Sequence, residues 1–313
     1  MMKPLTSVTA FAPATSANVA VGFDILGFAL EQLGDTVTLT KSVDPKLRIA
    51  SISGTDQLPY EIEKNSATVA LLAMLDHLGL PQNFELHLQK KIPLGSGLGG
   101  SAASSVAPLV ALNAFLTDPL SLEELVQFAL YGEEIACGAK HGDNVIPSLY
   151  GGITLVHSLV PLQIIPLPVI PLIAVLVHPH LRLDTRDSRA ALKKTIELSS
   201  FIKQSAHLAA FISALYEENY DRLAMACKDE LIEGMRAHLI PGFYEVQDAA
   251  MINGALACSI SGSGPTMFAL TTTEKQAEQI AEAMRLAFQN QGIESDSIIS
   301  PIASRGAHVI SEA

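Results

Sequence analysis

Tryptophan is absent from the 313-residue sequence, and only 5% of the residues are aromatic. The hydrophobic core must therefore be aliphatic. Cysteine is scarce as well: Cys137, Cys227 and Cys258 are odd in number, far apart and without CxxC spacing. This pattern is typical of free thiols in a reducing compartment.

Positive charge is in short supply. Lys and Arg number 20 against 32 Asp and Glu, so the formal net charge is −12. No basic cluster is longer than a pair, which argues against nucleic-acid partners and anionic membranes. Any anionic ligand must therefore be held by local groups.

Long apolar runs are also lacking. The most apolar segment, residues 166–177, is too short and too interrupted by proline to cross a bilayer. The N-terminus has one lysine and then a Thr/Ser-rich stretch without the apolar centre of a secretory signal. The sequence thus predicts a soluble protein of the cytoplasm, without a membrane partner.

The patterns that are present indicate a globular α+β protein of about two domains. Alternation at period two predicts strands over 6–12, 35–41 and 84–92, with a polar loop between the first two. Helical spacing predicts helices over 65–78, from the Ser121 capping box onward, over 188–201 and 208–236, and over 274–290. Residues 166–177 read as one buried strand and as a candidate crossover between domains. A strand, loop and strand are expected within 257–272, and a short strand near the C-terminus.

The segment PLGSGLGGSAAS at 93–104 has three interpretations. A flexible linker does not fit well, because the segment connects an alternating strand to a helical pattern. Gly95, Gly97 and Gly100 match the dinucleotide spacing G-x-G-x-x-G, but the preceding strand ends in two lysines instead of a continuous apolar run. No Lys precedes Ser101, which excludes a P-loop. The third interpretation, the phosphate loop of another kind of kinase, explains more residues.

PLGSGLGGSAAS resembles the phosphate-binding motif P-x-x-x-G-L-x-S-S-A-A of the GHMP kinases, except that Gly100 stands where the family usually has Ser. Residues 11–30 and 259–270 are similar to the family's first and third motifs, so the resemblance spans nearly the whole chain. It implies the two-domain α+β GHMP kinase fold. An N-terminal ribosomal-protein-S5-like domain (1–165) would carry the phosphate loop. A C-terminal ferredoxin-like α/β sandwich (166–313) would complete the ligand cleft.

The same resemblance implies that the chain binds ATP. Glycines let the backbone approach the phosphates, while N–H groups and a helix N-terminus offset their charge. The nucleotide-binding residues implied are Asn65, Pro93, Leu94, Gly95, Ser96, Gly97, Leu98, Gly99, Gly100, Ser101, Ala102, Ala103, Ser263 and Gly264. Asn65 could instead cap a helix, and 262–264 could be a purely structural hairpin.

Glu133 is the most informative single residue. Helical spacing aligns it with Leu122, Val126 and Ala129 on an apolar face, whereas Glu134 lies about 100° away. A buried charge needs a partner. The resemblance implies Mg²⁺, held by Glu133, the Ser101 hydroxyl and phosphate oxygens. An ion pair with Lys140 or solvation at the helix end is the alternative.

Three further segments resemble those of family members that phosphorylate the side-chain hydroxyl of L-homoserine, giving O-phospho-L-homoserine for threonine biosynthesis. They are residues 132–152, 185–189 and 233–243. This acceptor is a zwitterion, so its pocket needs cations for the carboxylate and an anion for the ammonium. Asp24, Arg189 and Arg236 could supply these charges, and Arg forks bind carboxylates bidentately.

The remaining substrate residues implied by the resemblance are Asn18, His141, Asn144, Thr185 and Gly262. Catalysis would involve Glu133, Asn144, Ser101 and His141, although Asn18, Asn144 and His141 could simply serve turns. Two alternative functions are a GHMP kinase for another small hydroxylated metabolite and a non-catalytic ligand-binding relative. Ser101, Glu133 and the two arginines argue against the second. We expect L-homoserine and ATP as the ligands, and a homodimer is compatible with the sequence.

Overall fold

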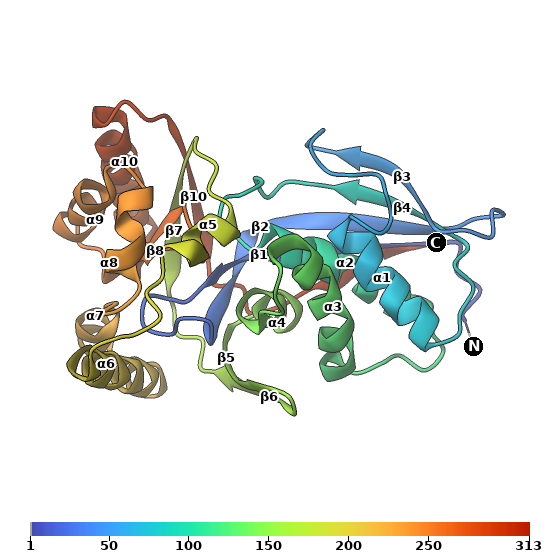
Figure 1. Cartoon of the computed structure of the whole chain (residues 1–313), viewed down its shortest axis with the longest axis horizontal. Coiled ribbons are helices and arrows are strands. Elements are labelled where there is room, and N and C mark those ends of the chain that lie inside the picture. The colour runs from blue at the N-terminus through green and yellow to red at the C-terminus, as the bar shows by residue number, and fades with distance from the viewer. Residues whose placement is uncertain (1) are drawn as a thin grey trace.

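The computed structural model describes residues 2–313, which form two β-sheets covered by helices (Figure 1). The first sheet has the order β11-β1-β2-β4-β3, with β5 paired to β2 and β6 paired to β5. Its strands are β1 (Ser7–Ala17), β2 (Leu26–Lys41), β3 (Arg48–Ser53), β4 (Phe84–Gln89), β5 (Ile153–Leu159), β6 (Leu162–Leu167) and β11 (His308–Glu312). The second sheet has the order β10-β7-β9-β8. Its antiparallel strands are β7 (Ile173–Pro179), β8 (Ala257–Ile260), β9 (Met267–Thr271) and β10 (Ser295–Pro301).

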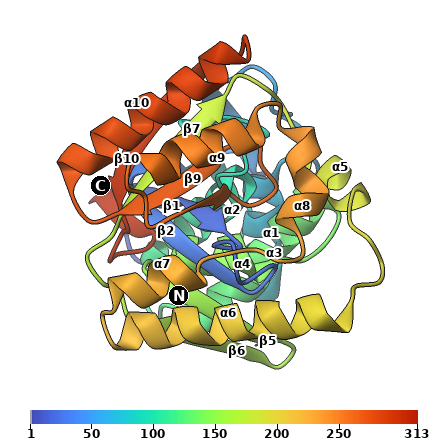
Figure 2. The same cartoon turned by 90° about the vertical axis from the view of Figure 1, so that its left-hand side faces the viewer.

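Four helices pack on the first sheet and on one another: α1 (Ser66–His77), α2 (Gly100–Phe115), α3 (Leu122–Cys137) and α4 (Gly142–Tyr150). In the second half α9 and α10 lie across the sheet, and the long helix α6 runs along another side (Figure 2). The helices of this half are α5 (Thr185–Ala190), α6 (Leu198–Tyr216), α7 (Tyr220–Ala226), α8 (Glu233–Arg236), η1 (Ala237–Leu239), α9 (Phe243–Ile252) and α10 (Glu274–Asn290). None of the helices within 2–313 has the length and apolarity that crossing a membrane requires.

Local signals in the sequence set several helix starts. The Asn65 side chain accepts the Ala67 N–H and caps α1, and Ser121 with Glu124 forms the expected capping box of α3. The core is largely aliphatic, as predicted. Even so, six phenylalanines are among its largest fully buried side chains, so the few aromatic residues are concentrated inside.

The predicted strands are extended or divided in the structure. β1 and β2 run farther than expected and leave only residues 18–25 as the loop between them. The expected strand over 166–177 is two strands, because the proline-containing stretch 168–172 carries the chain from β6 in the first sheet to β7 in the second. The predicted domain boundary at 165/166 falls inside β6. β11, assigned from sequence to the C-terminal domain, returns to pair with β1.

The helices predicted over 188–201 and 208–236 are wrong in their bounds. The chain forms α5, α6, α7 and α8 instead. Glu218 has φ of 51°, and the Asn219 side chain then accepts the Arg222 N–H to start α7. A left-handed residue followed by a capping residue ends a helix and restarts it in another direction, which apolar periodicity alone does not reveal.

A buried ion pair ties the first sheet to α2. The Lys90 ammonium contacts the Asp35 carboxylate on β2, and their side chains are 3% and 0% exposed. Lys90 Nζ also donates to Gly100 O (2.7 Å) and Ser104 Oγ (3.0 Å) in α2. Asp35 Oδ1 accepts the N–H groups of residues 91 (2.9 Å) and 92 (3.1 Å). The pair therefore fixes the start of α2 against the strand that leads into the glycine loop.

We predict that Lys90→Met lowers the free energy of unfolding by about 3–5 kcal/mol, because Asp35 would be left as an unpaired buried charge. Lys91→Met, at the exposed neighbouring position, is the matched control and should change it by no more than about 0.5 kcal/mol. Urea unfolding of both variants measures the difference. Equal, small effects would show that the ion pair contributes little.

Candidate active site

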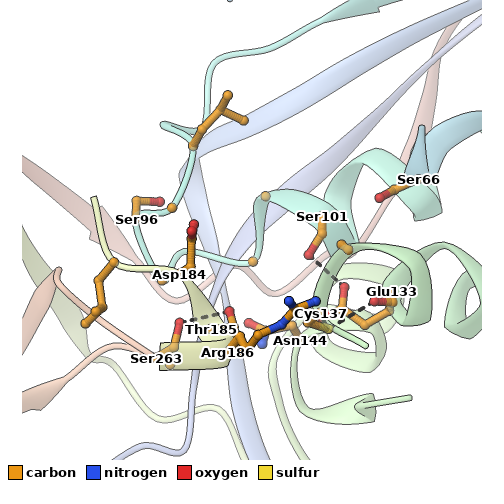
Figure 3. A pocket seen from close by; sticks show the side chains of 18 of the residues that line it. Ser66, Ser96, Ser101, Glu133, Cys137, Asn144, Asp184, Thr185, Arg186 and Ser263 are labelled. Atoms are coloured by element: carbon orange, nitrogen blue, oxygen red, sulfur yellow. Dashed lines mark hydrogen bonds between the residues drawn. The ribbon is translucent and has the colours of Figure 1, made fainter. Parts of the chain in front are cut away.

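A cavity of about 630 Å³ lies between elements of both halves, and Figure 3 shows many of its side chains. The glycine loop, α3 and α4 contribute from the first half. The segment around α5, Arg236 and the loop at 262–263 contribute from the second. This volume is in the range of small-molecule sites.

The carbonyl oxygens of the glycine loop are bonded to the surrounding protein. Each of the four at residues 95–98 accepts one hydrogen bond: Gly95 from Leu183 N–H (3.4 Å), Ser96 from Thr266 N–H (3.2 Å), Gly97 from the Ser261 hydroxyl (2.9 Å) and Leu98 from Thr15 N–H (3.1 Å). Among the described residues the N–H groups of residues 97–101 have no acceptor. Unpaired N–H groups beside a helix N-terminus form an anion-binding surface.

Two positions in this loop require glycine. Gly97 has φ of 78°, and a Cβ there would lie 2.4 Å from Ser261 O. Gly99 has φ of 65°, and its Cβ would lie 2.0 Å from Thr15 Oγ1. Gly100, which departs from the family motif, would direct a Cβ to within 3.1 Å of Lys90 Nζ. The loop is therefore pressed closely against the strands behind it.

Glu133 is buried, with 5% of its surface exposed, as its helical position predicts. The Ser101 hydroxyl donates to Oε2 (2.7 Å) and the Cys137 thiol donates to Oε1 (3.0 Å). Burial raises the pKa of Glu133 and also raises that of the Cys137 thiol, which stays protonated as a donor. Lys140 lies near Glu134 (3.6 Å), so the alternative of a Glu133–Lys140 ion pair is not what the structure forms.

This pair of oxygen ligands fits a magnesium ion. The Glu133 carboxylate and the Ser101 hydroxyl face the same cavity, and no cationic side chain of residues 2–313 forms an ion pair with Glu133. In the described part of the chain no group of three or more His, Cys, Asp or Glu could hold a metal. A hard cation at Glu133 would therefore complete its coordination with water and phosphate oxygens, as Mg²⁺ commonly does.

The charged residues expected to bind the substrate converge on the cavity. Arg189 Nη2 donates to Asp24 Oδ1 (2.6 Å) and lies 3.3 Å from His141 Nδ1. Arg236 is 3% exposed and donates to Gly262 O (3.1 Å) and Ser188 O (3.3 Å). Burial and the Arg189 charge lower the pKa of His141 and keep the imidazole neutral. Of these two guanidinium groups, that of Arg189 is paired with a carboxylate and that of Arg236 is bonded only to carbonyl oxygens.

Unpaired polar atoms gather at this end of the cavity. Within residues 2–313 four buried side-chain atoms lack a hydrogen-bond partner, and three belong to the cavity residues His141, Asp143 and Arg189. Buried polar atoms normally have partners. The unpaired Nε2 of His141, Oδ1 of Asp143 and Nε of Arg189 are therefore the positions at which a polar ligand would bond.

The loop at 18–25 presents Asp24 to the cavity in a strained conformation. Asn18, Val19, Ala20 and Asp24 all have positive φ. The Asn18 side chain holds the loop by donating to Gly262 O (2.8 Å) and accepting the Asp24 N–H (3.0 Å). Left-handed backbone at residues other than glycine persists where the surrounding structure fixes it, often at functional sites. Asn18 therefore acts on the position of Asp24, besides lining the cavity itself.

Asp143 was missed by sequence reasoning. It is fully buried beside Asn144 at the start of α4, and burial, then the Asp24 and Glu133 charges, raise its pKa to about 7. The sequence places it in the same DNV stretch as Asn144, but nothing local shows that both residues line the cavity. Asn144 Oδ1 accepts the Thr15 hydroxyl (2.7 Å), which leaves the Asn144 amide group as a donor.

Most of the site residues expected from sequence line the cavity. They are Asn18, Asp24, Asn65, Pro93, Leu94, Gly95, Ser96, Gly97, Gly99, Gly100, Ser101, Glu133, His141, Asn144, Thr185, Arg189, Arg236, Gly262 and Ser263. The side chains of Leu98, Ala102 and Ala103 point into the core, and Gly264 is outside the lining. The Asn65 side chain is bonded to Pro59 O and to Ala67 N–H, so it does cap α1 as well as facing the cavity.

Comparison with known proteins identifies related sequences. The model of the GHMP kinase N-terminal domain matches residues 65–152, and that of the C-terminal domain matches residues 211–290. A homoserine kinase of Xylella fastidiosa is 45% identical over 306 residues, covering 96% of this chain and 93% of the relative. A homoserine kinase of Xanthomonas campestris pv. campestris is 43% identical over 311 residues, covering 98% and 95%. The crystal structure of homoserine kinase from Cytophaga hutchinsonii superimposes with a TM-score of 0.95 at 43% identity, covering 99% of both chains.

We predict that Asp143→Asn stabilises the protein increasingly as the pH rises from about 4 to 7. The folded-state pKa of about 7 lies above the ordinary aspartate pKa of 3.8, so the native state holds a proton that the unfolded state has lost. Wild-type stability then falls by at most about 1.4 kcal/mol per pH unit across this window, and the asparagine removes that loss.

Urea unfolding at several pH values measures the difference between variant and wild type. It should grow up to about pH 7 and level off above it. Asp248→Asn, which replaces an exposed carboxylate on α9, is the control. A difference for Asp143→Asn that stays flat across the window would contradict the raised pKa.

Proposed function

The chain belongs to the GHMP kinases, and from this membership and the charges around its cavity we propose that it transfers the γ-phosphoryl group of ATP to the side-chain hydroxyl of L-homoserine. The family and the two-domain α+β fold predicted from the glycine-containing motifs are confirmed. The curated relatives at 40–45% identity are homoserine kinases, which supports this acceptor.

One observation carries the proposal: an anion-binding loop and a site for a zwitterion share one cavity. The N–H groups of residues 97–101 have no acceptor among the described residues, which suits the phosphates of ATP. Asp24 and Arg189 lie side by side, and an amino acid can place its ammonium against the first and its carboxylate against the second. Arg236 adds a second cation for the carboxylate. Mevalonate has no ammonium to place against Asp24. Galactose has neither charge, so it would use none of these three charged side chains.

The acceptor hydroxyl would lie beside α4. The free Asn144 amide donor can hold the hydroxyl oxygen in line with the γ-phosphorus, which that oxygen attacks as ADP leaves. The hydroxyl proton then needs an acceptor. Asp143 has an unpaired oxygen and a pKa of about 7, which suits a general base.

In the Asp143→Asn variant we therefore expect kcat to fall, with little change in the KM for L-homoserine or for ATP. An unchanged kcat would remove Asp143 from this role.

Glu133 and Ser101 would hold Mg²⁺, which would offset the charge of the phosphates. Phosphoryl transfer depends mainly on positioning and charge stabilisation. The chain's own contribution is to fix the phosphates with loop N–H groups and the α2 N-terminus. The three free cysteines are typical of a protein in a reducing compartment, and a cytoplasmic location stays a prediction. A homodimer is a prediction as well.

Glu133→Gln should lower kcat by roughly a hundred-fold, because it removes a charge that stabilises the transition state through the metal. It should also raise the Mg²⁺ concentration needed for half-maximal activity. Glu134→Gln is the matched control at an exposed neighbouring position, and should change kcat by less than about two-fold. A coupled ADP-release assay across Mg²⁺ concentrations measures both. Similar kcat values for the two variants would contradict a metal-binding role for Glu133.

The substrate assignment is tested by ADP release with L-homoserine, mevalonate, galactose and shikimate. We expect turnover with L-homoserine and little stimulation by the others.

Arg236→Leu should raise the KM for L-homoserine by roughly ten-fold or more, because a partly buried carboxylate loses a partner worth about 2–5 kcal/mol. The KM for ATP should stay nearly constant. Faster turnover of another alcohol would overturn the acceptor, and an unchanged KM in Arg236→Leu would overturn the carboxylate site.

A further inference from the structure

Phe23 contacts two of the arginines that line the cavity, Arg189 and Arg236, without lining the cavity itself. The Arg236 guanidinium carbon is 5.1 Å from the centre of the Phe23 ring, and that of Arg189 is 5.8 Å away. Both distances are within the reach of a cation–π interaction, in which a cation is attracted to the negative face of the ring. One aromatic ring thus contacts both cations of the proposed carboxylate site.

The contact with Phe23 offsets part of the repulsion between the charges of Arg189 and Arg236. Arg189 and Arg236 carry like charges close enough that the charge of Arg189, after burial, lowers the pKa of Arg236. Arg189 is paired with Asp24, whereas the bonds of Arg236 go only to the carbonyl oxygens of Ser188 and Gly262. The Phe23 ring adds an attraction to both guanidinium groups without taking up any of their N–H donors. The N–H donors that are not bonded to Asp24, Ser188 or Gly262 remain available for a carboxylate.

The backbone on either side of Phe23 is held by two side chains, Asn18 and Gln204. Asn18 bonds the N–H of the following residue, Asp24 (3.0 Å). The buried Gln204 of α6 donates to Val21 O (2.9 Å) and accepts the Glu230 N–H (2.8 Å) in the segment that leads to α8. The loop that carries Phe23 and the segment that carries Arg236 are thus bonded to the same side chain. The backbone that carries the ring is therefore tied to the segment that leads to Arg236.

We propose that Phe23 is a positioning residue that holds Arg189 and Arg236 in the arrangement that binds the substrate carboxylate. This inference rests on the proposed function. Phe23 acts only through the arginines, so it determines the preference for an acceptor with a carboxylate and has no direct role at the phosphates. The hydroxyl and ATP subsites lie on other elements, α4 and the glycine loop.

The test compares Phe23→Leu, which removes the ring, with Phe23→Tyr, which keeps it. Phe23→Leu should raise the KM for L-homoserine roughly three- to ten-fold, with little change in kcat or in the KM for ATP. It should also reduce the discrimination against the neutral amide of L-homoserine. Phe23→Tyr should restore wild-type values to within about two-fold. Phe11→Leu, at a half-buried ring on β1, is the control for loss of a phenylalanine elsewhere.

Combination with Arg236→Leu separates this inference from the proposed function. Because the ring acts through both arginines, adding Phe23→Leu to Arg236→Leu should raise the homoserine KM by clearly less than Phe23→Leu does in the wild type, since coupled residues are not additive. Full additivity, or a parallel loss of kcat and of ATP binding, would show a general packing role and overturn the proposal. If Arg236→Leu alone leaves the homoserine KM unchanged, the carboxylate site of the proposed function fails first.

Discussion

The site depends on how the backbone of the glycine loop is oriented. The carbonyl oxygens of residues 95–98 are all bonded to the protein behind them, so the N–H groups that follow are left without partners and can face an anion. The donors to these carbonyls come from both halves of the chain: Thr15 from the first, and Leu183, Ser261 and Thr266 from the second. An anion-binding surface of this kind exists only when the two halves are together.

The part of the cavity around Asp24 also depends on bonds between the two halves of the chain. Asp24 belongs to a loop between β1 and β2, yet the bonds that fix this loop come from Gly262 and from Gln204 on α6. The loop keeps several residues at positive φ, which costs free energy that these contacts offset. These bonds therefore hold the loop that presents the Asp24 carboxylate to the cavity.

Although the chain is acidic overall, its charged side chains differ in what surrounds each of them. The Lys90–Asp35 pair is buried away from water and serves the attachment of α2, whereas the Arg189–Asp24 pair is partly open and faces the cavity. Glu133 and Asp143 are both buried carboxyl groups with raised pKa values, and neither forms an ion pair with a basic side chain of the described chain. Burying a carboxylate without a nearby cation costs folding free energy. Their presence in one cavity therefore indicates ligands that bring positive charge or donate protons there.

The sequence by itself determined the features that depend on neighbouring residues. The Ser121 capping box, the glycines of the phosphate loop and the inward face of Glu133 follow from local propensity and from the helical period. The bounds of α6 to α8 and the return of β11 to the first sheet were decided by contacts between distant segments, which periodicity does not record. Asp143 is the clearest case. Its residue type and its neighbours were visible, but its pKa is raised first by its burial and then by the charges of Asp24 and Glu133, and only the folded chain produces that burial and brings those residues near it.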